Sequence, residues 1–142
     1  MTESTQIVQP YLFFNGRCEE ALEFYRQALG AEVQTSFRYK DSPEPPPPDC
    51  VPPDFEDKIM HCSFRIGSTV LMASDGDSAD ASRFAGFSLS LSLQTAEEAS
   101  RAFEALQEGG NVVMPLGKTF FSPQFGMVTD RFGVMWMVIV RV

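Results

Sequence analysis

The fold is decided by residues 87–106, which read FSLSLSLQTAEEASRAFEAL. From Phe87 to Leu93, apolar and serine residues alternate strictly, which is typical of a β-strand with two different faces. Thr95 and Glu98 then match a capping box, the pattern that stabilises the first turn of a helix. The apolar positions that follow have the spacing of one helix face: Ala99, Ala102, Phe103 and Leu106. The stretch therefore predicts a strand followed directly by an amphipathic helix.

The same pattern occurs 78 residues earlier, where a predicted strand at 7–14 precedes a predicted helix at 19–29. The apolar face of that helix repeats the spacing of the later one: Ala21, Phe24, Tyr25 and Ala28. Gly30 and Gly109-Gly110 follow the two helices, as expected for residues that end a helix. Each half continues with three further predicted strands, at 31–39, 59–66 and 68–74, and at 111–121, 125–130 and 134–142. The fold class predicted is α+β, with two βαβββ modules produced by internal duplication.

Length and composition limit the possible functions. A chain of 142 residues favours one domain, which we divide into module one (7–76), a linker (77–86) and module two (87–142). The formal net charge of −8 disfavours nucleic acid and a polybasic membrane surface as partners. The single histidine, His61, excludes any metal site that needs two histidines from one chain.

Three cysteines without regular spacing indicate a reducing compartment, and no signal peptide or membrane-spanning run is visible, so we predict a cytoplasmic protein.

Residues 41–55 contain seven prolines and predict an exposed loop. This proline-rich loop is interpreted either as a long excursion between two strands or as a peptide ligand for a partner domain.

Several motifs resemble the vicinal oxygen chelate superfamily, which includes glyoxalase I, extradiol dioxygenases and bleomycin-resistance proteins. Within it, the chain is similar to the PhnB-like branch, whose members often carry the label "3-demethylubiquinone-9 3-methyltransferase domain". The motifs are Pro10-Tyr-Leu-Phe-Phe-Asn-Gly16, Glu20-Ala-Leu-Glu-Phe-Tyr25, Leu29-Gly30, Lys58-Ile-Met-His61, Ile66-Gly67, Leu71-Met72-Ala-Ser-Asp75, Gln124-Phe-Gly-Met127, Thr129-Asp-Arg-Phe-Gly133 and Trp136-Met137. The resemblance covers residues 7–142 and implies a cup-shaped curled sheet around a cavity, in a homodimer.

The resemblance also implies four ligand positions, one in the first and one in the last strand of each module. In this sequence they are occupied by Pro10, Met72, Ser88 and Met137. None of these is a usual ligand for Zn²⁺, Ni²⁺, Fe²⁺ or Mn²⁺, so we predict no metal and no cofactor. No glycine-rich strand-to-helix turn supports a methyltransferase cofactor either.

The candidate catalytic residues are His61 and Asp75. His61 lies on a predicted strand and would act as a general base only with a partner within hydrogen-bond reach. Asp75 is the nearest acid within the family motifs, and the alternative is a structural histidine. Cys62 is interpreted as a buried thiol or as a nucleophile, although neither a basic neighbour nor a helix N-terminus lowers its pKa. Cys18, at the entry to the predicted helix, is better placed for reactivity, but nothing in the sequence pairs with it.

The candidate ligand-binding residues are those that would line the cup. Ser88, Ser90 and Ser92 share one strand face, which lines the cavity or faces solvent. The apolar lining would come from Phe13, Met60, Met72, Phe125, Met127, Trp136 and Met137, with core packing as the alternative for each.

Three functions remain open at this point. The first is a protein that binds a small, partly apolar molecule in a metal-free cup. The second is a metal-dependent enzyme of the glyoxalase or dioxygenase type. The third is a structural or interaction subunit whose cavity is filled.

Overall fold

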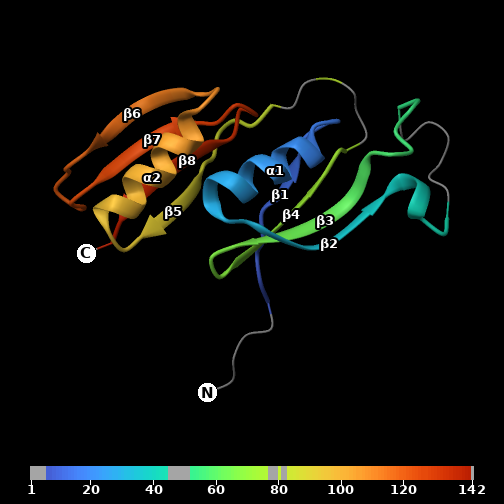
Figure 1. Ribbon diagram of the computed structural model, residues 1–142, viewed down its shortest axis with the longest axis horizontal. Coiled ribbons are helices and arrows are strands. Elements are labelled where there is room, and N and C mark those ends of the chain that lie inside the picture. The colour runs from blue at the N-terminus through green and yellow to red at the C-terminus, as the bar shows by residue number, and fades with distance from the viewer. Residues whose placement is uncertain (1–5, 45–51, 77–79, 81–82, 142) are drawn as a thin grey trace, which may run out of the picture. The chain divides into compact units, whose positions relative to one another are not determined.

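The chain is seen in a computed structural model, in which residues 6–44, 52–76, 80 and 83–141 are described. It forms two compact units, residues 1–81 and 82–142 (Figure 1). Each unit is presented separately below. The finer division into one domain with a linker at 77–86 stays a prediction.

The first unit is a four-stranded sheet with one long helix. Its elements are β1 (Tyr11–Phe13), α1 (Cys18–Leu29), β2 (Glu32–Arg38), a 3-10 turn η1 (Tyr39–Asp41), β3 (Ile59–Ile66) and β4 (Thr69–Ser74). The strand order is β1-β4-β3-β2, with β1 parallel to β4 and the other pairs antiparallel. The first predicted strand, at 7–14, is therefore much shorter than expected, since only its centre pairs with β4.

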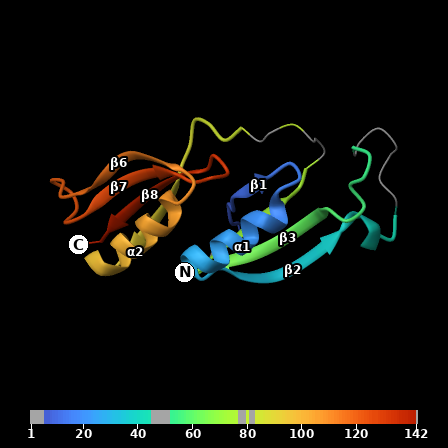
Figure 2. The same cartoon turned by 45° about the horizontal axis from the view of Figure 1, so that its top comes forward.

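Helix α1 lies across one face of this sheet (Figures 1 and 2). It ends at Gly30, which adopts a left-handed conformation with φ of 70°, as predicted. Tyr25 is fully buried beneath the helix, with its ring 6.2 Å from those of Phe14 and Phe64. The predicted apolar face was partly wrong, because Leu22 is buried and Phe24 is half-buried.

The second unit repeats the first. Its elements are β5 (Leu89–Leu93), α2 (Ala96–Gln107), β6 (Asn111–Gly117), β7 (Phe125–Thr129) and β8 (Met135–Val140). The strand order β5-β8-β7-β6 is equivalent to that of the first sheet, again with one parallel pair, β5 with β8. The prediction of two βαβββ modules is confirmed.

Helix α2 covers one face of the second sheet (Figure 2). The Thr95 hydroxyl accepts the backbone N–H of Glu98 at 3.1 Å, so the predicted cap is present. The Glu98 carboxylate accepts the Thr95 hydroxyl at 3.0 Å, not the backbone N–H that a complete capping box would use. The buried side of the helix is the predicted one: Ala99, Ala102, Phe103 and Leu106.

The region between β2 and β3 is described only in part. Residues 45–51 of the proline-rich loop lie outside the described residues. Phe55, the last residue of the proline-rich loop, is buried, and its ring lies 6.2 Å from that of Tyr39. Within the described ranges, neither helix is long and apolar enough to cross a membrane.

Candidate functional site

The face of the first sheet opposite α1 carries the candidate site. On β1, Leu12 is buried on the helix side, so the alternating Tyr11 and Phe13 lie on the other face. Met72 pairs with Tyr11 and His61 pairs with Phe37, which places these residues on the same face. We call the four rings Tyr11, Phe13, Phe37 and His61 the aromatic patch.

A polar pair lies within the aromatic patch. The Tyr11 hydroxyl and Nδ1 of His61 are 3.2 Å apart, and the two ring centroids are 5.6 Å apart. Both side chains are half-buried. If the Tyr11 hydroxyl donates to Nδ1, the Tyr11 oxygen is left as an acceptor and Nε2–H as a donor for a ligand. In the other neutral tautomer, Nδ1–H donates to the Tyr11 oxygen, which leaves the hydroxyl as a donor and Nε2 as an acceptor. The pair therefore offers a ligand one donor and one acceptor in either case.

The two phenylalanines flank this pair and are solvent-exposed. The ring of Phe13 lies 4.9 Å from that of Tyr11, and the ring of Phe37 lies 5.7 Å from that of His61. Phe13 is 53% exposed and Phe37 is 42% exposed. Since apolar rings are normally covered, this surface is suited to contact with a further apolar group.

Asp75 does not partner His61. Its side chain is 1% exposed, and its two oxygens accept the backbone N–H groups of Cys18 at 2.7 Å and Ile59 at 2.6 Å. The carboxylate therefore caps the N-terminus of α1 and fixes the start of β3, a structural role. These bonds engage both oxygens of Asp75, whereas the group in contact with Nδ1 of His61 is the Tyr11 hydroxyl.

The open face of the second sheet is lined with methionines. Ser90 on β5 pairs with Met137 on β8, which pairs with Met127 on β7, which in turn pairs with Met114 on β6. We call this line of residues across the four strands the methionine row. The adjacent row contains Phe125, whose ring lies 5.1 Å from that of Phe121. Flexible thioethers give a surface that adapts to varied apolar shapes.

Trp136 lies on the opposite face of this sheet, beneath α2. It is 3% exposed, and its indole N–H donates to Oδ2 of Asp130 at 2.9 Å. The other oxygen of Asp130 accepts the backbone N–H groups of Phe132 and Val134. Trp136 is therefore a core residue, and the structure does not bring it together with the other predicted lining residues.

The remaining predicted lining residues differ in position. Met60 is half-buried, at the point where the pairing between β2 and β3 shifts by one residue. Ser88 precedes β5 and is half-buried, whereas Ser90 and Ser92 are exposed. The choice between a cavity-lining and a solvent-facing serine row stays a prediction.

Sequence reasoning missed two residues of the aromatic patch. Tyr11 could have been identified, because it is two positions from Phe13 on the same strand and therefore shares its face. Phe37 could not, because the register of β2 against β3 shifts twice, between Val33 and Thr35 and again after Phe37.

The four positions that the resemblance implies for metal ligands carry residues that do not fit a metal ion. Pro10 has no side-chain donor, and its carbonyl oxygen accepts the backbone N–H of Met72 at 2.9 Å. Met72 and Met137 offer only thioethers, and Ser88 offers a hydroxyl. Among the described residues, no three His, Cys, Asp or Glu side chains are grouped to hold a metal.

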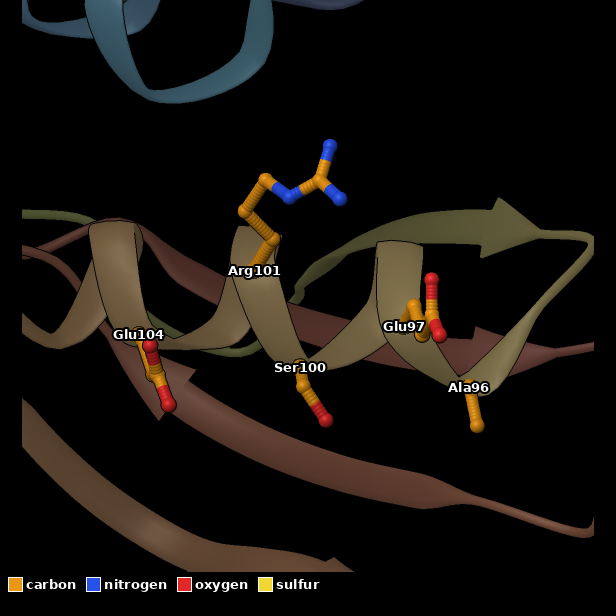
Figure 3. A pocket seen from close by; sticks show the side chains of 5 residues that line it. All are labelled: Ala96, Glu97, Ser100, Arg101 and Glu104. Atoms are coloured by element: carbon orange, nitrogen blue, oxygen red, sulfur yellow. The ribbon is translucent and has the colours of Figure 1, made fainter.

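A shallow hollow on α2 contains none of the candidate catalytic, ligand-binding or metal-ligand residues. It is lined by residues of that helix alone: Ala96, Glu97, Ser100, Arg101 and Glu104 (Figure 3). Its charged side chains are exposed on the surface of the helix. The surface of a single helix does not enclose a ligand, and in Figure 3 the side chains of Arg101 and Glu104 point in different directions instead of converging as in a typical ligand site.

Comparisons with known proteins agree with this architecture. The chain is 36% identical to protein YjdN of Escherichia coli over 140 residues, which cover 94% of each protein. The crystal structure of PA1353 from Pseudomonas aeruginosa is 46% identical, with a TM-score of 0.83, covering 96% of this chain and 98% of that one. The PhnB protein from Bacillus cereus is 29% identical, with a TM-score of 0.77, over 95% and 99% of the two chains.

The pattern of one protein family matches nearly the whole chain, from residue 7 to residue 138. Two βαβββ modules, each with a helix on one sheet face and an open face opposite, are the architecture that this match leads one to expect. The chain therefore belongs to the Glyoxalase/Bleomycin resistance protein/Dioxygenase superfamily.

Proposed function

We propose that this protein binds a small, partly apolar molecule without the help of a metal ion. The observation that carries the proposal is the hydrogen-bonded pair of Tyr11 and His61 between two exposed phenylalanine rings. The ligand has an aromatic ring, which packs against the aromatic patch, and a hydroxyl or carbonyl group, which bonds the polar pair.

The physical basis of this recognition has two parts. Aromatic side chains contribute by burying area and by edge or offset ring contacts, worth about 0.5–1.5 kcal/mol for each pair beyond the area. The polar pair adds specificity, because a ligand without a matching polar group leaves Tyr11 and His61 desolvated and without compensation. On the second sheet, the methionine row provides a further apolar surface, which can adapt to the shape of a ligand because thioether side chains are flexible.

Two ligands that differ only in a methyl group replacing the hydroxyl hydrogen test this proposal. We expect 1-naphthol to bind more tightly than its methyl ether, as measured by isothermal titration calorimetry, because the ether cannot donate to the Tyr11–His61 pair. Tyr11→Phe keeps the ring and removes the hydroxyl, so it lowers the affinity for 1-naphthol by roughly two- to tenfold. The variant leaves the affinity for the methyl ether nearly unchanged.

Tyr25→Phe is the matched control, since Tyr25 is fully buried beneath α1 on the other side of the sheet. This control binds 1-naphthol as the unmodified protein does. The proposal is wrong if 1-naphthol does not bind up to its solubility limit, or if both variants weaken it equally.

The donor set also predicts the behaviour towards metals. We expect the purified protein to contain far less than one equivalent of Ni, Zn, Fe or Mn per chain, because two thioethers, a hydroxyl and a proline do not bind these ions. Adding each divalent ion leaves the thermal unfolding midpoint unchanged, since a ligand that does not bind the native state does not stabilise it. Stoichiometric metal in elemental analysis would contradict the proposal and favour the metal-dependent enzyme.

A further inference from the structure

Two buried cysteines are in contact on the helix side of the first sheet. Sγ of Cys18 and Sγ of Cys62 are 3.8 Å apart, although the residues are 44 positions apart in the chain. Cys18 is the first residue of α1 and Cys62 lies within β3, and both are fully buried. A disulfide bond joins sulfurs about 2 Å apart, so the two atoms need to approach each other by only about 2 Å.

The surroundings distinguish the two thiols. Cys18 is hydrogen-bonded to Cys62, and this bond together with burial raises the pKa of the Cys18 thiol. The same hydrogen bond lowers the pKa of Cys62, because it stabilises the Cys62 thiolate. We therefore assign Cys62 as the nucleophile of the pair, since the thiolate is the reactive form of cysteine and the contact between the two sulfurs stabilises it at Cys62.

We propose that Cys18 and Cys62 are a redox-sensitive pair that a hydroperoxide converts to a disulfide. The Cys62 thiolate attacks one peroxide oxygen, the O–O bond breaks, and the leaving oxygen takes a proton and departs as an alcohol or water. Cys62 is then a sulfenic acid. The Cys18 sulfur attacks the Cys62 sulfur, the S–O bond breaks, and the hydroxide leaves as water with the Cys18 proton. In total, two thiols and one hydroperoxide give one disulfide, one alcohol or water, and one water.

The disulfide links the start of α1 covalently to β3. Asp75 already joins these places through hydrogen bonds to the backbone of Cys18 and Ile59. The new bond closes a long loop that includes the proline-rich segment, which restricts the unfolded chain. The pairing is independent of the proposed ligand binding, because Cys62 faces α1 and the neighbouring His61 faces the aromatic patch.

The third cysteine provides an internal control in the natural sequence. Cys50 lies outside the described residues, and in the sequence it is much closer to Cys62 than Cys18 is. In an unfolded chain, loop-closure entropy favours the pair with the shortest separation, which is Cys50 with Cys62. Only the folded structure favours the pair of Cys18 with Cys62.

The experiment oxidises the full chain with hydrogen peroxide, once in native buffer and once in concentrated urea, and maps the disulfides by mass spectrometry after the free thiols are alkylated. In native buffer we expect the Cys18 and Cys62 peptides to be joined, with the loss of two hydrogen atoms and reversal by dithiothreitol. In urea we expect mainly the pairing of Cys50 with Cys62. The thermal unfolding midpoint of the natively oxidised protein rises by several degrees and returns on reduction.

In the Cys50→Ser variant, Cys18 and Cys62 are the two remaining cysteines. We expect the number of free thiols in this variant to fall from two to none on oxidation. Adding Cys18→Ser to this variant leaves one thiol, which forms no intramolecular bond and gives no rise in the midpoint. The proposal is overturned if native oxidation yields the same pairing as urea, or if Cys18 and Cys62 remain thiols or are oxidised separately. Each of these outcomes is read from the same peptide map.

Discussion

Replacing Asp75 with asparagine lowers the free energy of unfolding by about 3 kcal/mol, because a buried carboxylate with two backbone partners is lost. Both oxygens of Asp75 accept backbone N–H groups, at 2.7 Å from Cys18 and 2.6 Å from Ile59. The amide of asparagine offers one oxygen, so its NH₂ group is forced against the second N–H. The negative charge at the N-terminus of α1 is lost as well. Urea unfolding followed by circular dichroism measures the change.

Asp54→Asn is the matched control for this variant. Asp54 is exposed and has a positive φ of 67°, a conformation that asparagine tolerates. We expect this variant to change the unfolding free energy by less than about 0.5 kcal/mol. Equal unfolding midpoints for the two variants would show that Asp75 does not hold α1 and β3 together.

Gly110→Ala destabilises the second unit by about 3 kcal/mol or more, because the added methyl group has no space. A Cβ atom on Gly110 would lie 2.1 Å from the carbonyl oxygen of Thr129 and 2.9 Å from the carbonyl carbon of Asp130. Both are backbone atoms, which cannot move aside as a flexible side chain would. The change also disturbs the pairing of Asn111 with Thr129, where β6 meets β7.

Gly117→Ala is the corresponding control, at the last residue of β6, the strand that Gly110 directly precedes. The nearest atom to a Cβ there is the carbonyl oxygen of Pro115, at 4.0 Å. We expect this variant to have the same stability as the unmodified protein or a slightly higher one, since alanine restricts the unfolded chain more than glycine does. A Gly110→Ala protein that unfolds at the same urea concentration as Gly117→Ala would contradict the predicted clash.

The modules were predictable because their signals are local. Alternation at 87–93, the Thr95 cap and the spacing of Ala99, Ala102, Phe103 and Leu106 depend on neighbouring residues only, and the structure confirms the helix they predict. The ends of the strands were less predictable. The first strand is limited to Tyr11–Phe13 by the extent of its pairing with β4, a partner 61 residues away along the chain.

The candidate site was harder to predict than the fold, because it depends on which face each strand presents. Trp136 is apolar and lies between Met135 and Met137, so composition alone suggests that all three act together. Because successive side chains of a strand point to opposite faces, Trp136 lies on the other face of β8 from Met135 and Met137. Its hydrogen bond to the buried Asp130 lies on the core side. The contact of Cys18 with Cys62 depends on the docking of α1 on β3, a long-range arrangement that spacing in the sequence does not reveal.

The two units differ in one practical respect that follows from the positions of His61 and Trp136. The chain contains one histidine and one tryptophan. His61 lies in the aromatic patch of the first unit, and Trp136 lies in the core of the second. The imidazole C–H resonances of the single histidine in an NMR spectrum therefore report on the first unit, and the fluorescence of the single tryptophan reports on the second. Ligand binding and unfolding can thus be assigned to one unit or the other without any labelling of the protein.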